Sequence, residues 1–381
     1  MRMRFARAGS IVLGVGLVLS GGAALAGGTS PATSVKFKSG PEAPFGGTRF
    51  DGAVVDGTVY FLGFRDVDNN TDGSIWTYDI KKKKYADTGV DMAVPVSNYT
   101  VAVLKDKTGT GLYTFGGRDN DGASIDTVQV YYPSSGKTAV LKKDKWPGMT
   151  PSDCVSLPAT GVTVVDNKAY ALGGMSFSTS VPACVDDNSN EVWVFDPMAK
   201  DGKKWTKGPN LKTARGYISA AVVGGNTIYA IGGDLNDAGT LTAQTNVETW
   251  KIGSKKWAKG ADLPQGCDET QAFAFDKGSL GGTITLAGCG QWPNAIPDVL
   301  QYDVKGGDWS TVGALAEARR NQAGVNIGSA KKPQLMVLGG YNSDGTLVLT
   351  TSEIGTAGKK AAAPGGVARI FSMSHGTAST N

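Results

Sequence analysis

The stretch SAAVVGGNTIYAIGG, residues 219–233, decides the fold that this sequence predicts. It contains two apolar runs joined by a short Gly-Gly-Asn turn, and the second run ends in a Gly-Gly pair. An aromatic segment with Trp250 and a final segment with Trp257 follow it. Short apolar runs bounded by turn residues are typical of β-strands. The unit therefore predicts a small antiparallel sheet of four strands.

The second strand of this unit recurs five more times along the chain. The copies are VYFLGF (59–64), LYTFGG (112–117), AYALGG (169–174), ITLAGC (284–289) and LMVLGG (335–340). The last residues of successive copies are 53, 57, 59, 56 and 51 residues apart. A nearly constant period of this size indicates a repeat architecture, and 54 glycines in 381 residues agree with a chain rich in turns.

This pattern resembles the kelch family, whose repeat of about 50 residues forms one blade of a β-propeller. The resemblance covers residues 35–354 and rests on the order of the Gly-Gly pair, a later aromatic residue and a final Trp. Trp205, Trp257 and Trp309 hold that last position, and Tyr85 replaces it in the first repeat. The resemblance implies an all-β, six-bladed kelch-type β-propeller with four-stranded antiparallel blades.

The two ends of the chain predict how the propeller closes. The sixth repeat ends near Ile354 without a fourth strand, whereas residues 35–39 resemble a fourth strand followed by its exit loop. We expect the N-terminal strand to complete the last blade, which removes an exposed sheet edge. The predicted propeller spans residues 27–356, and residues 357–381 form a flexible C-terminal tail.

Residues 1–26 predict a secretory signal peptide. Three arginines precede the apolar run 11–19, and Ala24-Leu25-Ala26 provides a cleavage pattern of small residues. The alternative is an N-terminal membrane anchor, but the run is shorter than a span requires. Removing the signal lowers the formal net charge from +4 to +1. We therefore expect a secreted or periplasmic protein without a nucleic-acid partner, and we interpret Lys81–Lys84 as a solvated hairpin end.

The four cysteines, Cys154, Cys184, Cys267 and Cys289, are typical of an oxidising compartment. Three pairings are possible. In the repeat register, Cys154 and Cys184 belong to the third blade, and Cys267 and Cys289 hold the matching positions in the fifth. We therefore favour the disulfides Cys154–Cys184 and Cys267–Cys289.

A candidate calcium loop lies in the first repeat. Asp68, Asn70 and Asp72 precede Gly73 at the alternating spacing of a calcium loop, and Asp79 stands at its twelfth position. The alternative is an ordinary Asp-Gly turn between two strands of a kelch repeat. Apart from this possible calcium ion, the sequence predicts no cofactor.

Arginines precede the first strand of several repeats, namely Arg49, Arg215, and Arg319 or Arg320. Together they predict a cationic ring that binds a carboxylate on a protein or an acidic glycan. The alternative is structural, because arginines at this place in kelch repeats often pair with a neighbouring carboxylate or carbonyl. Glu269 is the one candidate for a catalytic carboxylate on the same face.

The predicted function is non-catalytic recognition of a protein or glycan through the loop-bearing face. His375 is the sole histidine, so the copper chemistry of galactose oxidase, which is also built on a kelch propeller, is excluded. Bacterial sialic acid mutarotases are exported six-bladed kelch enzymes that open and reclose an acidic sugar ring. The alternative function is such a mutarotase or epimerase, with Glu269 as proton carrier and arginines for the substrate carboxylate.

Overall fold

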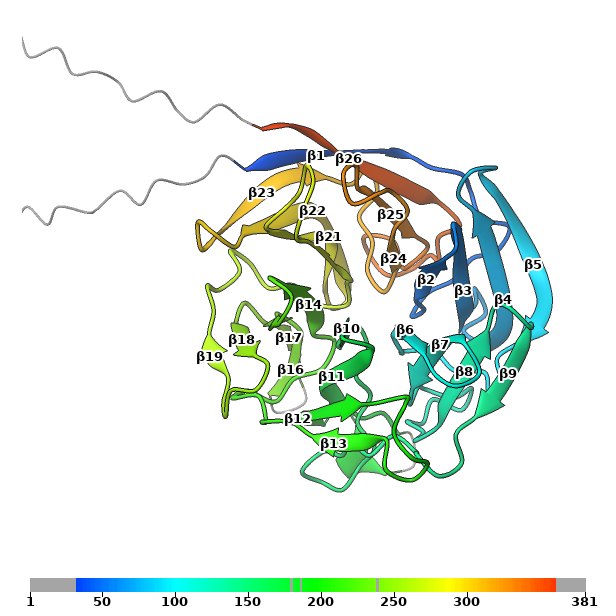
Figure 1. Ribbon diagram of the computed structural model, residues 1–381. Coiled ribbons are helices and arrows are strands. Elements are labelled where there is room, and N and C mark those ends of the chain that lie inside the picture. Colours follow the sequence, from blue (N-terminus) through cyan, green and yellow to red (C-terminus); the bar gives the residue numbers. More distant parts are fainter. Residues whose placement is uncertain (1–31, 179–180, 186, 238–239, 361–381) are drawn as a thin grey trace, which may run out of the picture.

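A computed structural model describes residues 32–178, 181–185, 187–237 and 240–360. These residues form six four-stranded antiparallel sheets arranged around a central axis (Figure 1), which confirms the six-bladed propeller. The predicted signal peptide and the chain beyond residue 360 lie outside the described residues. In the described part of the chain, no helix is long and apolar enough to cross a membrane.

The blades follow one another along the chain, and in each the strands run outward from the axis. Blade one contains β2 (Gly52–Val55), β3 (Thr58–Arg65), β4 (Thr71–Asp79) and β5 (Lys84–Asp91). Blade two contains β6 (Val101–Lys105), β7 (Thr110–Phe115), β8 (Val128–Tyr132) and β9 (Lys137–Val140). Blade three contains β10 (Val162–Val165), β11 (Lys168–Met175), β12 (Asn188–Phe195) and β13 (Trp205–Lys207), with the short 3-10 helix η1 (Pro182–Cys184) between β11 and β12.

The second half of the propeller adds one extra hairpin to this plan. Blade four contains β14 (Ser219–Val223), β15 (Thr227–Ile231), β18 (Val247–Lys251) and β19 (Ala258–Lys259). The extra hairpin is formed by β16 (Asp234–Asp237) and β17 (Thr240–Ala243). Blade five contains β20 (Ala272–Phe275), β21 (Thr283–Gln291), β22 (Asn294–Asp303) and β23 (Asp308–Ala314). Blade six contains β24 (Ala323–Asn326), β25 (Gln334–Leu338), β26 (Ser352–Lys360) and β1 (Thr33–Ser39).

The N-terminal strand closes the last blade, as the sequence predicted. β1 pairs antiparallel with β26, with Val35 opposite Ala357 and Phe37 opposite Gly355 (Figure 1). A Cβ atom on Gly355 would lie 2.5 Å from the Phe37 ring, so this position needs glycine. β26 continues through Lys360, four residues beyond the boundary expected at residue 356.

Glycine near the axis and aromatic residues farther out give each blade its wedge shape. Gly233 follows the second strand of blade four by two residues and has a φ of 99°, and a Cβ there would lie 2.3 Å from the Gly216 carbonyl oxygen. Trp257 on the outer side is 2% exposed, and its indole N–H donates to the Pro209 carbonyl at 2.8 Å. Close backbone approach and aromatic filling are therefore the physical basis of the repeat.

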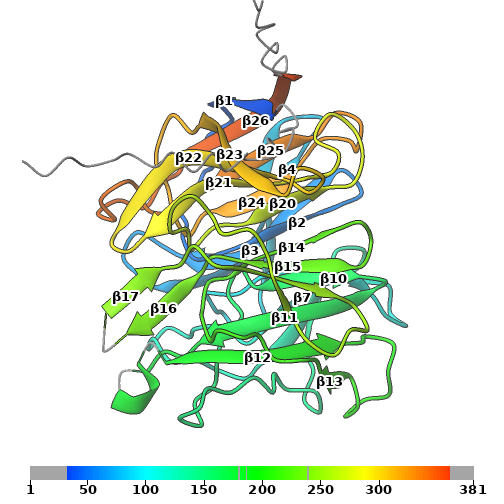
Figure 2. The ribbon, with the colours of Figure 1, turned by 90° about the vertical axis from the view of Figure 1, so that its left-hand side faces the viewer.

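The propeller has two faces of different construction. One, the turn face, carries the tight turns between first and second strands and between third and fourth strands. The other, the mouth face, carries the loops between second and third strands and those that connect the blades. The β16–β17 hairpin stands out from this second face (Figure 2).

Candidate functional site

The mouth face is organised by one backbone contact in each blade. The residue that follows the Gly-Gly position of the second strand forms an isolated bridge to a residue of the loop that enters the blade. The six bridges are Thr48–Arg65, Ser97–Arg118, Leu157–Met175, Gly216–Asp234, Asp268–Gly290 and Arg320–Tyr341. Arginines therefore belong to the bridges of blades one, two and six, and aspartates to those of blades four and five.

A ring of left-handed residues lies next to these bridges. Each blade places one non-glycine residue with positive φ two or three residues before its innermost strand: Arg49, Asn98, Thr160, Tyr217, Glu269 and Asn321. Backbone hydrogen bonds link neighbours in this ring, including Asn98 N–H to Arg49 O at 2.7 Å and Asn321 N–H to Glu269 O at 2.8 Å. Such conformations cost on the order of 1–3 kcal/mol each and cluster at functional sites. The ring marks the channel mouth as the candidate site.

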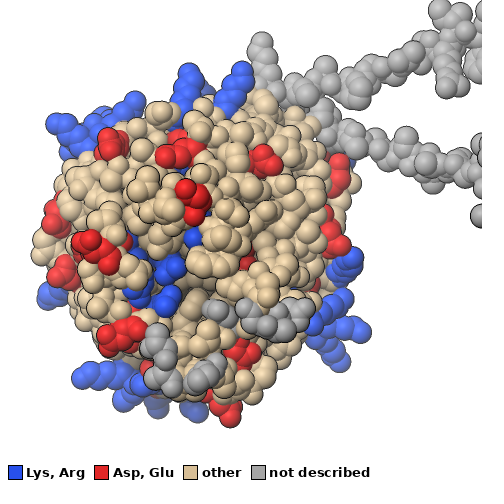
Figure 3. Space-filling view, turned by 180° about the vertical axis from the view of Figure 1, so that it is seen from behind, with Lys and Arg blue, Asp and Glu red and all other residues tan. Residues whose placement is uncertain are grey.

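A pocket of about 520 Å³ opens at this mouth. Its polar wall contains Arg49, Arg118, Tyr217 and Glu269. Its apolar wall contains Met175, Phe177, Val185, Leu241 and Trp292. Figure 3 views the mouth face and shows blue basic atoms gathered in a hollow near its centre. The pocket thus brings cationic groups and apolar side chains together in one lining.

The arginines of blades one and two create the positive end of the site. The Arg118 guanidinium lies 4.8 Å from the Phe177 ring, and its Nε donates to the Gly122 carbonyl at 2.8 Å. Arg65 is 2% exposed and donates to Ser97 Oγ and to two backbone carbonyls. Burial, and then the nearby charges of Arg118 and Arg49, lower the pKa of Arg65 to about 10. The site therefore holds an excess of positive charge in little solvent.

Aromatic rings hold the other two arginines in place. The guanidinium groups of Arg49 and Arg320 lie 5.4 and 4.8 Å from the centroid of the Tyr341 ring. Arg320 also lies 4.7 Å from the ring of Trp292, which is 49% exposed at the rim. Stacking of this kind fixes the planar guanidinium and suits a ligand that has both a carboxylate and a flat apolar part.

Glu269 is the carboxylate of the pocket wall, and it is already bound to an arginine. Its Oε2 accepts a hydrogen bond from Arg320 Nη1 at 2.7 Å, and both side chains are nearly fully buried. The next carboxyl, Asp268, is buried beside Asp234. Burial, followed by the charge and hydrogen bond of Asp234, raises the pKa of Asp268 well above its usual value. The Asp268 carboxyl group is therefore a weaker acid than an exposed aspartate.

Tyr217 lines the pocket and links two blades. Asn98 of blade two donates a hydrogen bond from Nδ2 to the Tyr217 hydroxyl of blade four. Burial raises the pKa of Tyr217, and the charge of Glu269 acts in the same direction. Tyr217 thus contributes a neutral hydroxyl to the pocket lining.

The structure separates the predicted arginine ring into two groups. Arg49 lines the pocket, and Arg320 supports it through Glu269 and Trp292. Arg215 is fully buried inside blade four, where it pairs with Glu248 at 2.7 Å. Arg319 is likewise buried inside blade six, beside Glu353 and Glu317 at 3.3 Å. These two arginines hold loops to strands, as in the structural alternative.

Two arginines were not among the predicted site residues: Arg118, which lines the pocket, and Arg65, which is buried close to Arg118 and Arg49. Both follow the Gly-Gly position of their second strand, at Gly63-Phe64 and Gly116-Gly117. Aligning the six repeats at their Gly-Gly positions would have identified both arginines. In every blade, the residue after this position forms a backbone bridge to the loop that enters the blade on the mouth face.

Both disulfides join the pairs that the repeat register favours, Cys154–Cys184 and Cys267–Cys289. They close loops with sequence separations of 30 and 22 residues on the mouth face. Val185 directly follows the first of these loops, Glu269 lies within the second, and both residues line the pocket. The disulfides therefore restrain loops that build the site.

The four predicted calcium ligands do not come together. Asp68, Asn70 and Asp72 belong to the β3–β4 hairpin, whereas Asp79 is the last residue of β4 and pairs with Lys82 at 3.0 Å. Seven residues of extended strand separate Asp72 from Asp79 by about 23 Å. Asp66 Oδ1 already organises the hairpin by accepting the backbone N–H groups of Asp68 and Asn70. Among the described residues, no group of three or more metal-ligating side chains is present.

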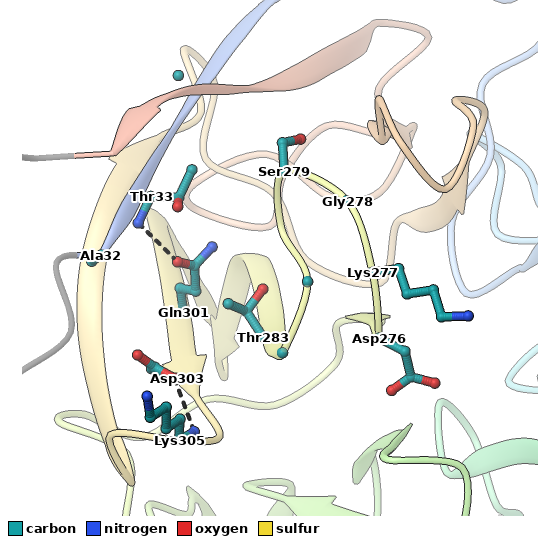
Figure 4. Close-up of a pocket in the computed structure, with 13 residues that line it drawn as sticks. Ala32, Thr33, Asp276, Lys277, Gly278, Ser279, Thr283, Gln301, Asp303 and Lys305 are labelled. Atoms are coloured by element: carbon teal, nitrogen blue, oxygen red, sulfur yellow. Dashed lines mark hydrogen bonds between the residues drawn. The ribbon is translucent and has the colours of Figure 1, made fainter.

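A second cavity, of about 910 Å³, lies between blade five and the closing strand β1 on the turn face (Figure 4). Gln301 bridges its wall by accepting the Thr33 backbone N–H at 3.2 Å. Asp276, Lys277, Asp303 and Lys305 supply both signs of charge around it. It lacks the one-sided charge and the aromatic wall of the mouth pocket, so the mouth is the better candidate site.

Comparison with known proteins agrees with this architecture. Residues 51–277 match the family described as the KLHDC2/KLHL20/DRC7 Kelch-repeats domain, so the chain is a kelch-repeat β-propeller and belongs to this family. Kelch propellers are generally protein-interaction domains.

Several proteins of known sequence or structure resemble parts of the chain. It is 26% identical to alpha-scruin of Limulus polyphemus over 56% of this chain and 21% of that protein. It is 27% identical to human Kelch-like protein 28 over 32% of this chain and 19% of that protein. The chain thus spans about a fifth of the length of these relatives. The solved structure of YjhT has the same fold, with a TM-score of 0.60, 18% identity, and coverage of 82% of this chain and 95% of that one.

Proposed function

We propose that this protein binds a carboxylate-bearing ligand, presented by a protein or an acidic glycan, in the mouth pocket of the propeller. The observation that carries the proposal is one pocket lined both by Arg49 and Arg118 and by the aromatic rings of Phe177 and Trp292. Arg65 and Arg320 lie close to this lining and add to its positive field. Two disulfides, and the secretory signal predicted from the sequence, favour an encounter with this ligand outside the cytoplasm.

The planar guanidinium groups explain why the ligand is expected to carry a carboxylate. Arginine offers two parallel N–H donors that match the two oxygens of a carboxylate. A flat sugar face or an apolar side chain beside that carboxylate would contact Trp292, which is half exposed at the rim. The proposal therefore requires both a negative charge and an adjoining apolar face in the ligand.

We expect Arg118→Gln to weaken binding of such a ligand by about 10- to 100-fold, because a charge-assisted hydrogen bond contributes roughly 1.5–3 kcal/mol. Isothermal titration calorimetry with N-acetylneuraminate, and with a short peptide that ends in an acidic and an aromatic residue, measures the change. The methyl ester of each ligand removes the negative charge and should bind at least as weakly as the acid binds to the variant.

Lys142→Gln is the matched control, since it removes one positive charge at an exposed position outside the pocket. It should leave the dissociation constant unchanged at physiological salt. Equal weakening by both substitutions would show a general effect of charge and would contradict a specific carboxylate site.

The alternative function is a mutarotase that acts on an acidic sugar. Glu269 favours it, because this carboxylate lines the same pocket as Arg49 and Arg118. Ring opening requires removal of the proton from the anomeric hydroxyl and delivery of a proton to the ring oxygen, which a carboxylate can carry out in turn. Arg320 would hold the carboxylate in place through its 2.7 Å hydrogen bond.

If the protein is such an enzyme, Glu269→Gln should abolish acceleration of N-acetylneuraminate anomer exchange, a loss of at least 100-fold, because the amide cannot accept the proton. Exchange NMR measures the rate at equilibrium. The binding function alone predicts no acceleration by either protein, and acceleration by both would remove Glu269 from the reaction.

A further inference from the structure

The basic residues of the chain are divided between the two faces of the propeller. The eleven turns of the turn face contain thirteen lysines, six aspartates and no arginine. The six loops between second and third strands, on the mouth face, contain ten aspartates, Arg118 and no lysine. The predicted mature chain, with a formal charge of only +1, therefore has two oppositely charged faces. Figure 3 agrees, because acidic side chains are scattered over the mouth face and most basic ones stand at its edge.

The lysines of the turn face are accessible and come from every blade. Twelve of the thirteen are exposed, and only Lys204 is half-buried, with Nζ donating to the Pro197 and Ala199 carbonyls. The thirteen are Lys81, Lys82, Lys83, Lys107, Lys200, Lys203, Lys204, Lys255, Lys256, Lys277, Lys305, Lys331 and Lys332. They are spread across the disc, so the whole face is positively charged.

We propose that the turn face docks electrostatically on the surface of an anionic phospholipid bilayer. Each lysine near such a surface adds to the attraction, which extends over about one Debye length, roughly 10 Å at 0.1 M salt. Lysines from six blades reach a planar surface together, whereas a linear polyanion would cross only part of the disc. Lysine is a flexible, hydrated point charge, and it suits lipid headgroups that need no fixed geometry.

The turn face lacks the features that single-stranded nucleic acid would need. Among the residues of the eleven turns, Trp257 is the one aromatic side chain, and it is 2% exposed. Bases therefore have no ring to stack on. Docking by this face would leave the mouth pocket pointing away from the bilayer, so the inference holds whatever ligand the mouth takes.

Vesicle sedimentation of the purified protein tests the proposal. We expect binding to vesicles that contain phosphatidylglycerol and phosphatidylcholine, no binding to phosphatidylcholine alone, and release in 0.5 M NaCl. The variant Lys255→Glu/Lys256→Glu/Lys331→Glu/Lys332→Glu reverses four turn-face charges and should reduce the partition coefficient at least 100-fold.

The variant Lys36→Glu/Lys38→Glu/Lys145→Glu/Lys212→Glu is the matched control, because it changes the net charge equally at exposed residues outside the turn face. It should keep at least a third of the parent's binding. Equal loss in both variants, or failure of the parent to bind the anionic vesicles at low salt, would overturn the proposal. Binding to heparin or single-stranded DNA without binding to vesicles would likewise overturn it and identify a linear polyanion as the partner.

Discussion

Replacing Arg215 with methionine is expected to lower the free energy of unfolding by about 3–5 kcal/mol, the usual cost of removing one partner from a buried ion pair. The Arg215 guanidinium is fully buried and bonds Glu248 at 2.7 Å. It also donates to the carbonyls of Gly232, Ala230 and Thr213. Loss of the guanidinium would leave the Glu248 charge without its partner in a site that excludes water. Urea unfolding followed by tryptophan fluorescence measures the change.

The double variant Arg215→Met/Glu248→Gln separates the charge from the packing. Glu248 also accepts the backbone N–H groups of Lys212 and Thr213 at 2.8 and 3.2 Å, and glutamine retains an oxygen that can accept one of them. Because the double variant buries no unpaired charge, we expect it to recover about 1–2 kcal/mol relative to Arg215→Met. A double variant less stable than the single one would show that the ion pair is not the source of the loss.

For the arginines, the sequence predicted the loop in which each residue lies but not whether its side chain lines the mouth or is buried inside a blade. Repeat spacing placed Arg49, Arg215 and Arg320 at corresponding loops, and all three do precede an innermost strand. Arg49 holds the left-handed position of its loop, and Arg320 stands one residue before the corresponding Asn321. Arg215 stands two residues before the corresponding Tyr217. These offsets of one or two residues separate side chains at the mouth from one inside the blade. A loop without internal periodicity does not reveal such an offset.

Features that depend on local pattern were easier to predict. The Gly-Gly positions and outer aromatic residues are fixed by close backbone approach within each blade, so six blades follow from six copies. Closure by β1 follows because blade six otherwise lacks a fourth strand. The four predicted calcium ligands lie apart for the opposite reason. Its spacing assumed a curved loop, but residues 71–79 form an extended strand that carries Asp79 to the other end of the blade.

Net charge was the least informative quantity for predicting a binding surface. It adds together the charges of the two faces, and which residues share a face is known only from the fold. Lys81–Lys84 alone indicates a solvated hairpin. Once the blades are arranged around an axis, the same lysines lie on one disc with those of five other blades. The distribution of charge, in contrast to its sum, depends on which turns share a face.

Replacing Asp51 with asparagine is expected to stabilise the protein at pH 8 by up to about 4 kcal/mol. Asp51 is buried beside the channel, and burial raises its pKa from 3.8 to about 7, although hydrogen bonds from the Val101 and Gly52 backbone act in the opposite direction. Between pH 3.8 and about pH 7, Asp51 keeps its proton in the folded protein but loses it in the unfolded chain. Stability contributed by Asp51 is therefore full below pH 4, falls as the pH rises, and is lost above about pH 7.

Asparagine removes this titration and keeps an oxygen that can accept the Val101 N–H, which Asp51 Oδ2 binds at 2.9 Å. Urea unfolding of parent and variant at pH 4, 5, 6, 7 and 8 should give two curves that nearly coincide at pH 4 and separate progressively as the pH rises. Asp56→Asn, at an exposed position in a turn of the same blade, should follow the parent. Asp268, whose raised pKa has the same sign, is present in all three proteins and cancels in the comparison. A difference between Asp51→Asn and the parent that stays constant from pH 4 to pH 8 would show that a lost or gained contact, and not the buried proton, separates them.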